Sequence, residues 1–160
     1  MHAKPQAEHE WLTQLVGEWE SEMEASMGPD QPPVKHLGTE TVRSLTVWIQ
    51  LEGLSTMPDG SPAHTTIMTL GYDPAKKRFV GSFIGSMMTN MWIYEGELDA
   101  TGKVLTLDAV GPSFADPTKE AKYKDAIEIV SPDHRILTSR FLGDDGQWNH
   151  FMTVHYRRKS

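Results

Sequence analysis

The stretch from Gly17 to Ala25 most constrains what this chain can fold into, because glutamates occupy every second position in it. Four other side chains alternate with the glutamates at a strict period of two: Trp19, Ser21, Met23 and Ala25. This alternation is typical of a β-strand with one face toward a core and one toward solvent. It therefore predicts a first strand with Trp19 on the buried face.

A short amphipathic segment precedes this strand. In residues 8–16 the side chains of Trp11, Leu12, Leu15 and Val16 fall on one helical stripe, and Gly17 follows where the helix must end. The pattern predicts a helix that runs directly into the first strand. We expect this helix to plug one end of a closed β-barrel.

The rest of the chain is divided by turn-forming residues into segments of strand length. The loop at 28–33 and the one at 57–62 are rich in Pro and Gly, and the segments 34–43 and 45–52 are separated only by Ser44, so they could also form one long bent strand. Further strands are expected at 64–72, 78–86, 90–98, 104–110, 122–130, 135–142 and 147–157. About ten short strands in an unbroken meander of hairpins close without crossovers, so the sequence predicts a mainly β, single antiparallel meander β-barrel rather than a sandwich.

Length, charge and cysteine content narrow the class of protein. The 160 residues suit one domain spanning 1–160, of which we expect residues 1–7 to be flexible, and the chain has no cysteine, which excludes a disulfide framework and thiolate chemistry. The net charge of −7 disfavours nucleic acid and anionic membranes as partners. No signal peptide or membrane span is evident, and a cytoplasmic location is the default expectation.

The pattern Gly17-Glu18-Trp19 resembles the first strand of the calycin superfamily, which includes lipocalin-type and nitrobindin-type barrels. The resemblance implies structural roles for Gly17, Trp19 and Arg158, with the arginine from the last strand covering the tryptophan. The whole chain is similar to the bacterial domain-of-unknown-function family numbered 1579, through the following segments: 15–19, 71–73, 80–84, 95–96, 102–103 and 156–159. This resemblance implies a calycin-like barrel and no particular reaction.

Strand parity predicts an interior rich in aromatic and methionine side chains with a few polar groups, and such a lining suits either a ligand pocket or a filled core. Arg43 is expected to be an inward cation with Glu40 or Asp125 as its counter-ion. The leading hypothesis is a barrel that carries or senses a small apolar or amphipathic molecule. Its candidate ligand-binding residues are Arg43, Met68, Phe83, Tyr94, Asp125, His150, Met152 and Tyr156.

Three alternatives stay open at this point. A small hydrolase or isomerase would use inward Asp125 and His150 as acid and base. The sequence has no Gly-x-Ser-x-Gly, Walker or His-Glu-x-x-His motif, however, and the absence of these motifs favours a non-enzymatic role. A haem-binding barrel through His150 is suggested by the nitrobindin resemblance, whereas the histidine spacing predicts no zinc site. A homodimeric interaction module is suggested by Trp48 and Trp92, expected on outward faces, which together with methionines at a rim would form an exposed apolar patch. No cofactor is identified by the sequence.

Overall fold

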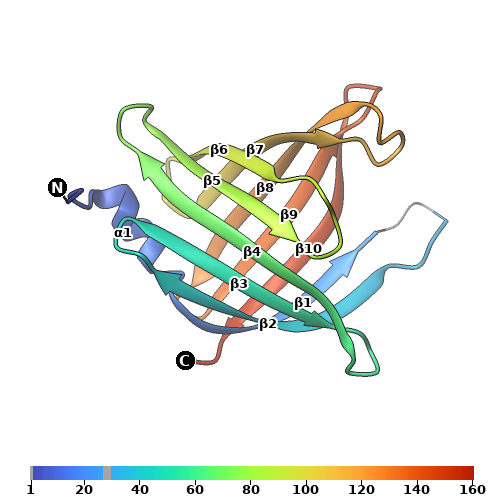
Figure 1. The fold of residues 1–160 in the computed structure, drawn as a ribbon, viewed down its shortest axis with the longest axis horizontal. Coiled ribbons are helices and arrows are strands. Elements are labelled where there is room, and N and C mark those ends of the chain that lie inside the picture. The colour runs from blue at the N-terminus through green and yellow to red at the C-terminus, as the bar shows by residue number, and fades with distance from the viewer. Residues whose placement is uncertain (1, 27–29) are drawn as a thin grey trace.

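Ten antiparallel strands close into one barrel, and a single short helix precedes them (Figure 1). The structure, a computed structural model, describes residues 2–26 and 30–160. The elements are α1 (Ala7–Thr13), β1 (Gly17–Ala25), β2 (Val34–Ser44), β3 (Trp48–Thr56), β4 (Pro62–Asp73), β5 (Arg78–Gly85), β6 (Trp92–Leu98), β7 (Val104–Pro112), β8 (Glu120–Ser131), β9 (His134–Leu142) and β10 (Trp148–Arg158). Each strand pairs with its neighbours in sequence, and β1 pairs with β10 to close the barrel. The expected meander barrel is confirmed; positions 28 and 29 of the expected loop lie outside the described residues.

The turn between β2 and β3 lacks glycine and proline. For this reason the sequence alone did not decide between two strands and one long bent strand here. Thr46 adopts a φ of 69°, and the amide of Leu45 donates a hydrogen bond of 2.7 Å to the carbonyl of Trp48. A positive φ at a β-branched residue is uncommon. Here the pairing of the two flanking strands, Ser44 with Ile49, holds the tight turn in place.

The meander places successive hairpins at alternate ends of the barrel, so the two ends differ (Figure 1). At the helix end, the indole N–H of Trp11 donates to the carbonyl of Gly102 in the β6–β7 turn at 2.7 Å. The guanidinium of Arg158 donates to the carbonyl of Pro132 in the β8–β9 turn at 3.0 Å. The opposite end, formed by the β1–β2, β3–β4, β5–β6, β7–β8 and β9–β10 connections, has no helix over it among the described residues, and we call it the open end.

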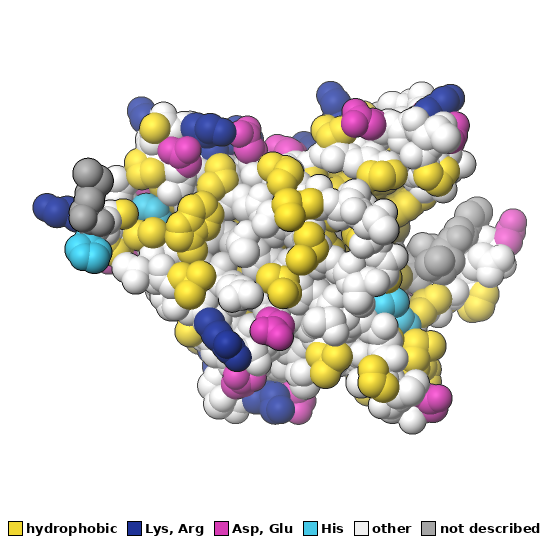
Figure 2. Space-filling view, viewed as in Figure 1, with side chains coloured by type: hydrophobic (Ala, Val, Ile, Leu, Met, Phe, Trp, Pro, Cys, Tyr) yellow, Lys and Arg dark blue, Asp and Glu magenta, His cyan; other side chains and the backbone are white. Residues whose placement is uncertain are grey.

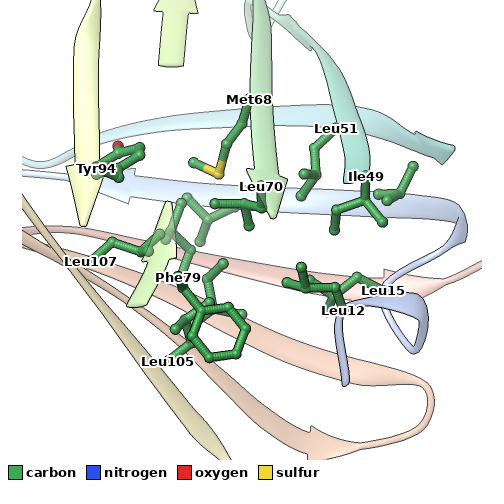
Figure 3. Close-up of a cluster of buried hydrophobic side chains, with 14 of the residues drawn as sticks. Leu12, Leu15, Ile49, Leu51, Met68, Leu70, Phe79, Tyr94, Leu105 and Leu107 are labelled. Atoms are coloured by element: carbon green, nitrogen blue, oxygen red, sulfur yellow. The ribbon is translucent and has the colours of Figure 1, made fainter. Parts of the chain in front are cut away.

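The core fills the helix end. Leu12 and Leu15, at and just beyond the end of α1, are each 1% exposed and pack near Ile49, while Leu70, Phe79 and Leu105 continue the apolar layer across the barrel (Figure 3). Burying side chains of this size is the dominant favourable contribution to folding. The helix end is thus a packed hydrophobic core that α1 covers.

Trp19 lies at the centre of this end. Its indole N–H donates to the carbonyl of Leu15 at 2.9 Å, and the guanidinium carbon of Arg158 lies 4.2 Å from the ring centre. The same guanidinium donates to the carbonyls of Val16, at 2.7 Å, and Gln14, at 2.8 Å. Gly17 makes this arrangement possible, because it has a φ of +140° and a Cβ at its position would collide with the Arg158 side chain.

The outer surface mixes charged side chains with scattered hydrophobic ones on the face seen in Figure 2. Trp48 is 43% exposed, but Trp92 is buried and points into the barrel. The outward Trp92 required by the homodimer hypothesis is therefore wrong, because the even positions of β6 face inward. Within residues 2–26 and 30–160, no helix has the length and hydropathy needed to span a membrane.

Candidate functional site

The open half of the barrel is hollow, whereas the helix end is packed. A cavity of about 150 Å³, which we call the apolar lobe, has walls of aromatic side chains: Phe83, Trp92, Tyr94, Phe114, Tyr123 and Phe151. Methionines complete much of its remaining wall: Met68, Met87, Met88 and Met152. An apolar cavity of about 150 Å³ is large enough to take up benzene in an engineered protein. The apolar lobe therefore has the size and lining of a small-ligand site.

A second cavity of about 120 Å³, the polar lobe, adjoins the apolar lobe. The two lobes share Phe83, Met87, Leu137 and Met152, so these side chains form the partition between them. Eight polar side chains line the polar lobe and not the apolar one: Ser21, His36, Thr39, Glu40, Ser55, His64, Thr66 and Tyr156. The interior is thus amphipathic, with an aromatic half and a hydroxyl- and imidazole-bearing half.

Three polar side chains from different strands converge on the apolar lobe. The hydroxyl of Tyr94 on β6 donates to Oδ2 of Asp125 on β8 at 2.5 Å, and Ser139 on β9 is the residue directly opposite Asp125 on the neighbouring strand. Tyr94 is 4% exposed and Ser139 is 3% exposed. The pairing of Asp125 with Ser139 across β8 and β9 brings these two side chains to the same inward position. The convergence creates one polar anchor point in an otherwise apolar wall.

Burial raises the pKa of the Asp125 carboxyl, and the hydroxyl groups of Tyr94 and Ser139 act in the opposite direction. The pKa of Tyr94 is also raised, first by burial and then by the charge of Asp125. Among the described residues that line the apolar lobe there is no lysine, arginine or histidine, and the titratable groups beside Asp125 are Tyr94 and Tyr123. The carboxylate therefore lacks a cationic partner within the lobe.

We expect Asp125→Asn to stabilise the protein at neutral pH. Because the folded-state pKa is raised, the stability that protonation of Asp125 contributes is present below the ordinary aspartate pKa and is lost as pH rises through the folded-state value. Chemical denaturation at pH 7 should give Asp125→Asn a higher free energy of unfolding than the parent, and the gain should vanish below about pH 4. Asp108→Asn, on the outer face of β7, is the control and should show no gain. A loss of stability in Asp125→Asn at every pH would contradict this expectation.

Beneath the two lobes lies a buried ion pair between Arg135 on β9 and Glu40 on β2, which are 2% and 7% exposed. The guanidinium carbon of Arg135 also lies 3.8 Å from the ring centre of Tyr156 and 4.8 Å from that of Trp19. This layer separates the hollow half of the barrel from the packed helix end. The positive charge of Arg135 is thus already matched by Glu40.

Two histidines face each other in the polar lobe. The ring centres of His36 and His64 are 5.6 Å apart, and Nδ1 of His36 is buried without a hydrogen-bond partner in the described structure. In the part of the chain that the structure describes, no group of three histidine, aspartate or glutamate side chains is arranged to hold a metal ion. The pair is suited to hydrogen bonding with a polar ligand group.

The structure brings most of the predicted ligand-binding residues together. Met68, Phe83, Tyr94, Asp125 and Met152 line the apolar lobe. Phe83 and Met152 also line the polar lobe, to which Tyr156 contributes.

The expected inward orientation of His150 is wrong. His150 is exposed, hydrogen-bonds to the hydroxyl of Thr153 at 2.7 Å, and faces an outer groove with Glu22, Glu24 and Lys35. A β-bulge between His150 and Met152 inserts one extra residue, so the parity of β10 reverses there. Asp125 and His150 therefore lie on opposite faces of the barrel wall, which removes the proposed acid–base pair and the proposed haem ligand.

The expected inward orientation of Arg43 is also wrong. The buried positions of β2 are His36, Glu40 and Val42, all even-numbered. Arg43 is odd-numbered, so its side chain lies on the other face of the strand and is exposed. The arginine that points into the barrel is Arg135 on β9. Nothing in the sequence of this strand indicates that it carries a buried charge. The predicted pairing of Arg43 with Glu40 or Asp125 is therefore wrong, and Glu40 pairs with Arg135 instead.

Several lining residues were missed by sequence reasoning. His36 and His64 alternate correctly for inward positions on β2 and β4, so parity alone could have found them. Ser139 would have followed from the alternation of Arg135, Leu137 and Ser139 on β9. Phe114 lies in the loop after β7, where no periodic pattern exists, and only the folded chain brings it against Tyr123 and Phe151.

Together these features define a closed ten-stranded barrel with a helix-plugged end and a ligand-sized cavity at the other. The chain belongs to the family described as "Protein of unknown function (DUF1579)", whose model matches residues 4–158. A search of curated proteins found no significant match.

Solved structures with similar folds share little sequence with this chain. Rv2717c from M. tuberculosis superposes with a TM-score of 0.72 at 14% identity, over 98% of this chain and 100% of the other. EF1p2_mFAP2b, solved bound to DFHBI, superposes with a TM-score of 0.51 at 15% identity, over 96% of this chain and 100% of the other. At these identities the likeness establishes the barrel fold and nothing about the ligand.

Proposed function

We propose that this protein binds a small apolar or amphipathic molecule in the open half of its barrel, as a carrier or sensor rather than as an enzyme. The observation that carries the proposal is the contrast between the two halves of the interior. The helix end is packed by its own side chains, whereas the open half leaves lobes of about 150 and 120 Å³. Protein interiors are normally close-packed, so empty space of this size has a stability cost that a binding role would explain.

The lining supports a ligand with one apolar and one polar part. Aromatic and methionine side chains offer an adaptable apolar surface in one lobe, and the hydroxyl and imidazole groups of the other can hydrogen-bond. EF1p2_mFAP2b, a barrel of similar fold, was solved bound to DFHBI, which is in keeping with a small-molecule ligand for a barrel of this kind. His150 lies on the outer face, and none of the described residues that line the apolar lobe with Asp125 is a histidine, which favours binding over acid–base catalysis.

Filling the apolar lobe should weaken ligand binding. Ala109 is 7% exposed and lines this lobe, so Ala109→Leu places three more carbon atoms in the cavity. Titration with an uncharged, environment-sensitive naphthalene dye should show at least about tenfold weaker binding than in the parent, since an overfilled site costs more than about 1.4 kcal/mol.

Val110 supplies the matched control, because it is the next residue on the same strand, points outward and is 53% exposed. Val110→Leu should bind the dye as the parent does, and circular dichroism should show all three proteins folded. Native mass spectrometry of gently purified protein then reports any ligand that co-purifies. If the dye binds none of the three proteins and nothing co-purifies, the carrier or sensor function is wrong.

A further inference from the structure

We propose that the ligand is an organic cation, an amine or quaternary ammonium with a small apolar body, whose charge is neutralised by Asp125 in the apolar lobe. This inference rests on the proposed function and names the chemical class of the ligand. It follows from the unmatched carboxylate, the aromatic walls around it and the charge of the whole molecule.

The first observation is the missing counter-ion of Asp125. Asp125 is half-buried and faces the apolar lobe. Charges taken out of water in proteins are normally paired, and this chain follows that rule at the fully buried Arg135 and Glu40. Asp125 receives a hydrogen bond from Tyr94 but forms no ion pair with any described residue, and none of the described residues lining its lobe is basic. The hydrogen bond is donated to the carboxylate by a neutral group, so it orients the carboxylate and leaves its charge in place.

The second observation is the set of aromatic rings that line the same lobe as this carboxylate. Trp92 and Tyr123 pack edge to face with ring centres 4.7 Å apart, and Phe114 and Phe151 do so at 5.0 Å. Aromatic faces attract cations electrostatically, and cages of such rings recognise quaternary ammonium groups. A carboxylate set among aromatic rings matches a cation far better than it matches an anion or a neutral hydrocarbon.

The third observation is the charge of the molecule as a whole. The net charge of −7 favours the approach of cations. The buried cation nearest to the lobes is Arg135. It lines the small space beneath them together with Glu40, and it does not line the apolar lobe. An anionic ligand would therefore meet Asp125 without any basic residue to offset it.

Two probes of nearly equal shape isolate the effect of charge. Phenyltrimethylammonium is a permanent cation, and tert-butylbenzene is its uncharged carbon analogue. Competition against the uncharged naphthalene dye should show the parent protein binding the cation at least about tenfold more tightly than the hydrocarbon, the size of effect expected for a desolvated cation–aromatic site.

The Asp125→Asn variant should lose this preference, with the affinity for tert-butylbenzene changed by less than about threefold. Asp108→Asn is the control, because it removes the same unit of charge from the outer face of the neighbouring strand β7. It should retain the preference. Equal affinity of the parent for both probes, or an unchanged preference in Asp125→Asn, would overturn the cation assignment while leaving the proposed binding function intact. Failure of the dye and both probes to bind would overturn both.

Discussion

Trp19→Ala should unfold the protein or bring it close to unfolding. Trp19 is 1% exposed, donates a hydrogen bond to Leu15 and lies against the guanidinium groups of Arg158 and Arg135. Truncating a buried indole costs about 3–5 kcal/mol, against a total stability of about 5–15 kcal/mol for a typical domain. Removing this ring also takes away the surface on which Arg135 rests, so we expect the upper end of that range. Urea denaturation followed by circular dichroism measures the loss.

Trp148 provides the control for this experiment. It is 38% exposed on the outer face, where its ring lies 5.0 Å from the Lys124 ammonium group. Trp148→Ala removes the same side chain from a partly exposed site on the outer face and should cost less than about 1 kcal/mol. His150→Ala, also exposed, should behave similarly. A Trp19→Ala protein that melts like the parent would show that the helix end is not the stabilising core.

Glu40→Met should be the second most damaging substitution, because it leaves the charge of Arg135 buried without a partner. Arg135 is 2% exposed, and its Nε already lacks a hydrogen-bond partner among the described residues. Breaking a buried ion pair by removing one member typically costs about 3–5 kcal/mol. The exposed pair of Lys76 and Glu95, 3.2 Å apart, gives the comparison: Glu95→Met should cost less than about 1 kcal/mol.

A double-mutant cycle tests the cause of this loss. Replacing both members with methionine removes the unpaired charge as well as the pair, and apolar replacements of whole buried pairs are often neutral. The variant carrying Glu40→Met and Arg135→Met should therefore be more stable than the one carrying Glu40→Met alone. If the two losses simply add, packing rather than the ion pair accounts for the effect.

The helix, the number of strands and the closed topology could all be predicted from the sequence, because they depend on local patterns. The glutamate alternation of residues 17–25 identifies β1, and Leu12 and Leu15 identify the helix that covers it. The same parity identified Tyr94 and Asp125 as inward residues, and Met68 and Phe83 were predicted with them as ligand-binding residues. The structure places all four in one lobe. These strands have no register shift at the positions concerned, so counting by two stayed valid along them.

What the sequence determined by itself is the set of segments that form strands and, where a strand is regular, the face on which each side chain lies. The tertiary structure decided the features that depend on contacts between segments far apart in the sequence. The bulge in β10 reversed the orientation of His150, since an extra residue in one strand is defined only by its pairing with another. The partner of Glu40 is Arg135, 95 positions away, because barrel closure brings β2 near β9 through the interior. Whether the interior is hollow was likewise settled by packing, since side chains of the same composition can fill a barrel or line a cavity depending on how far they reach across it.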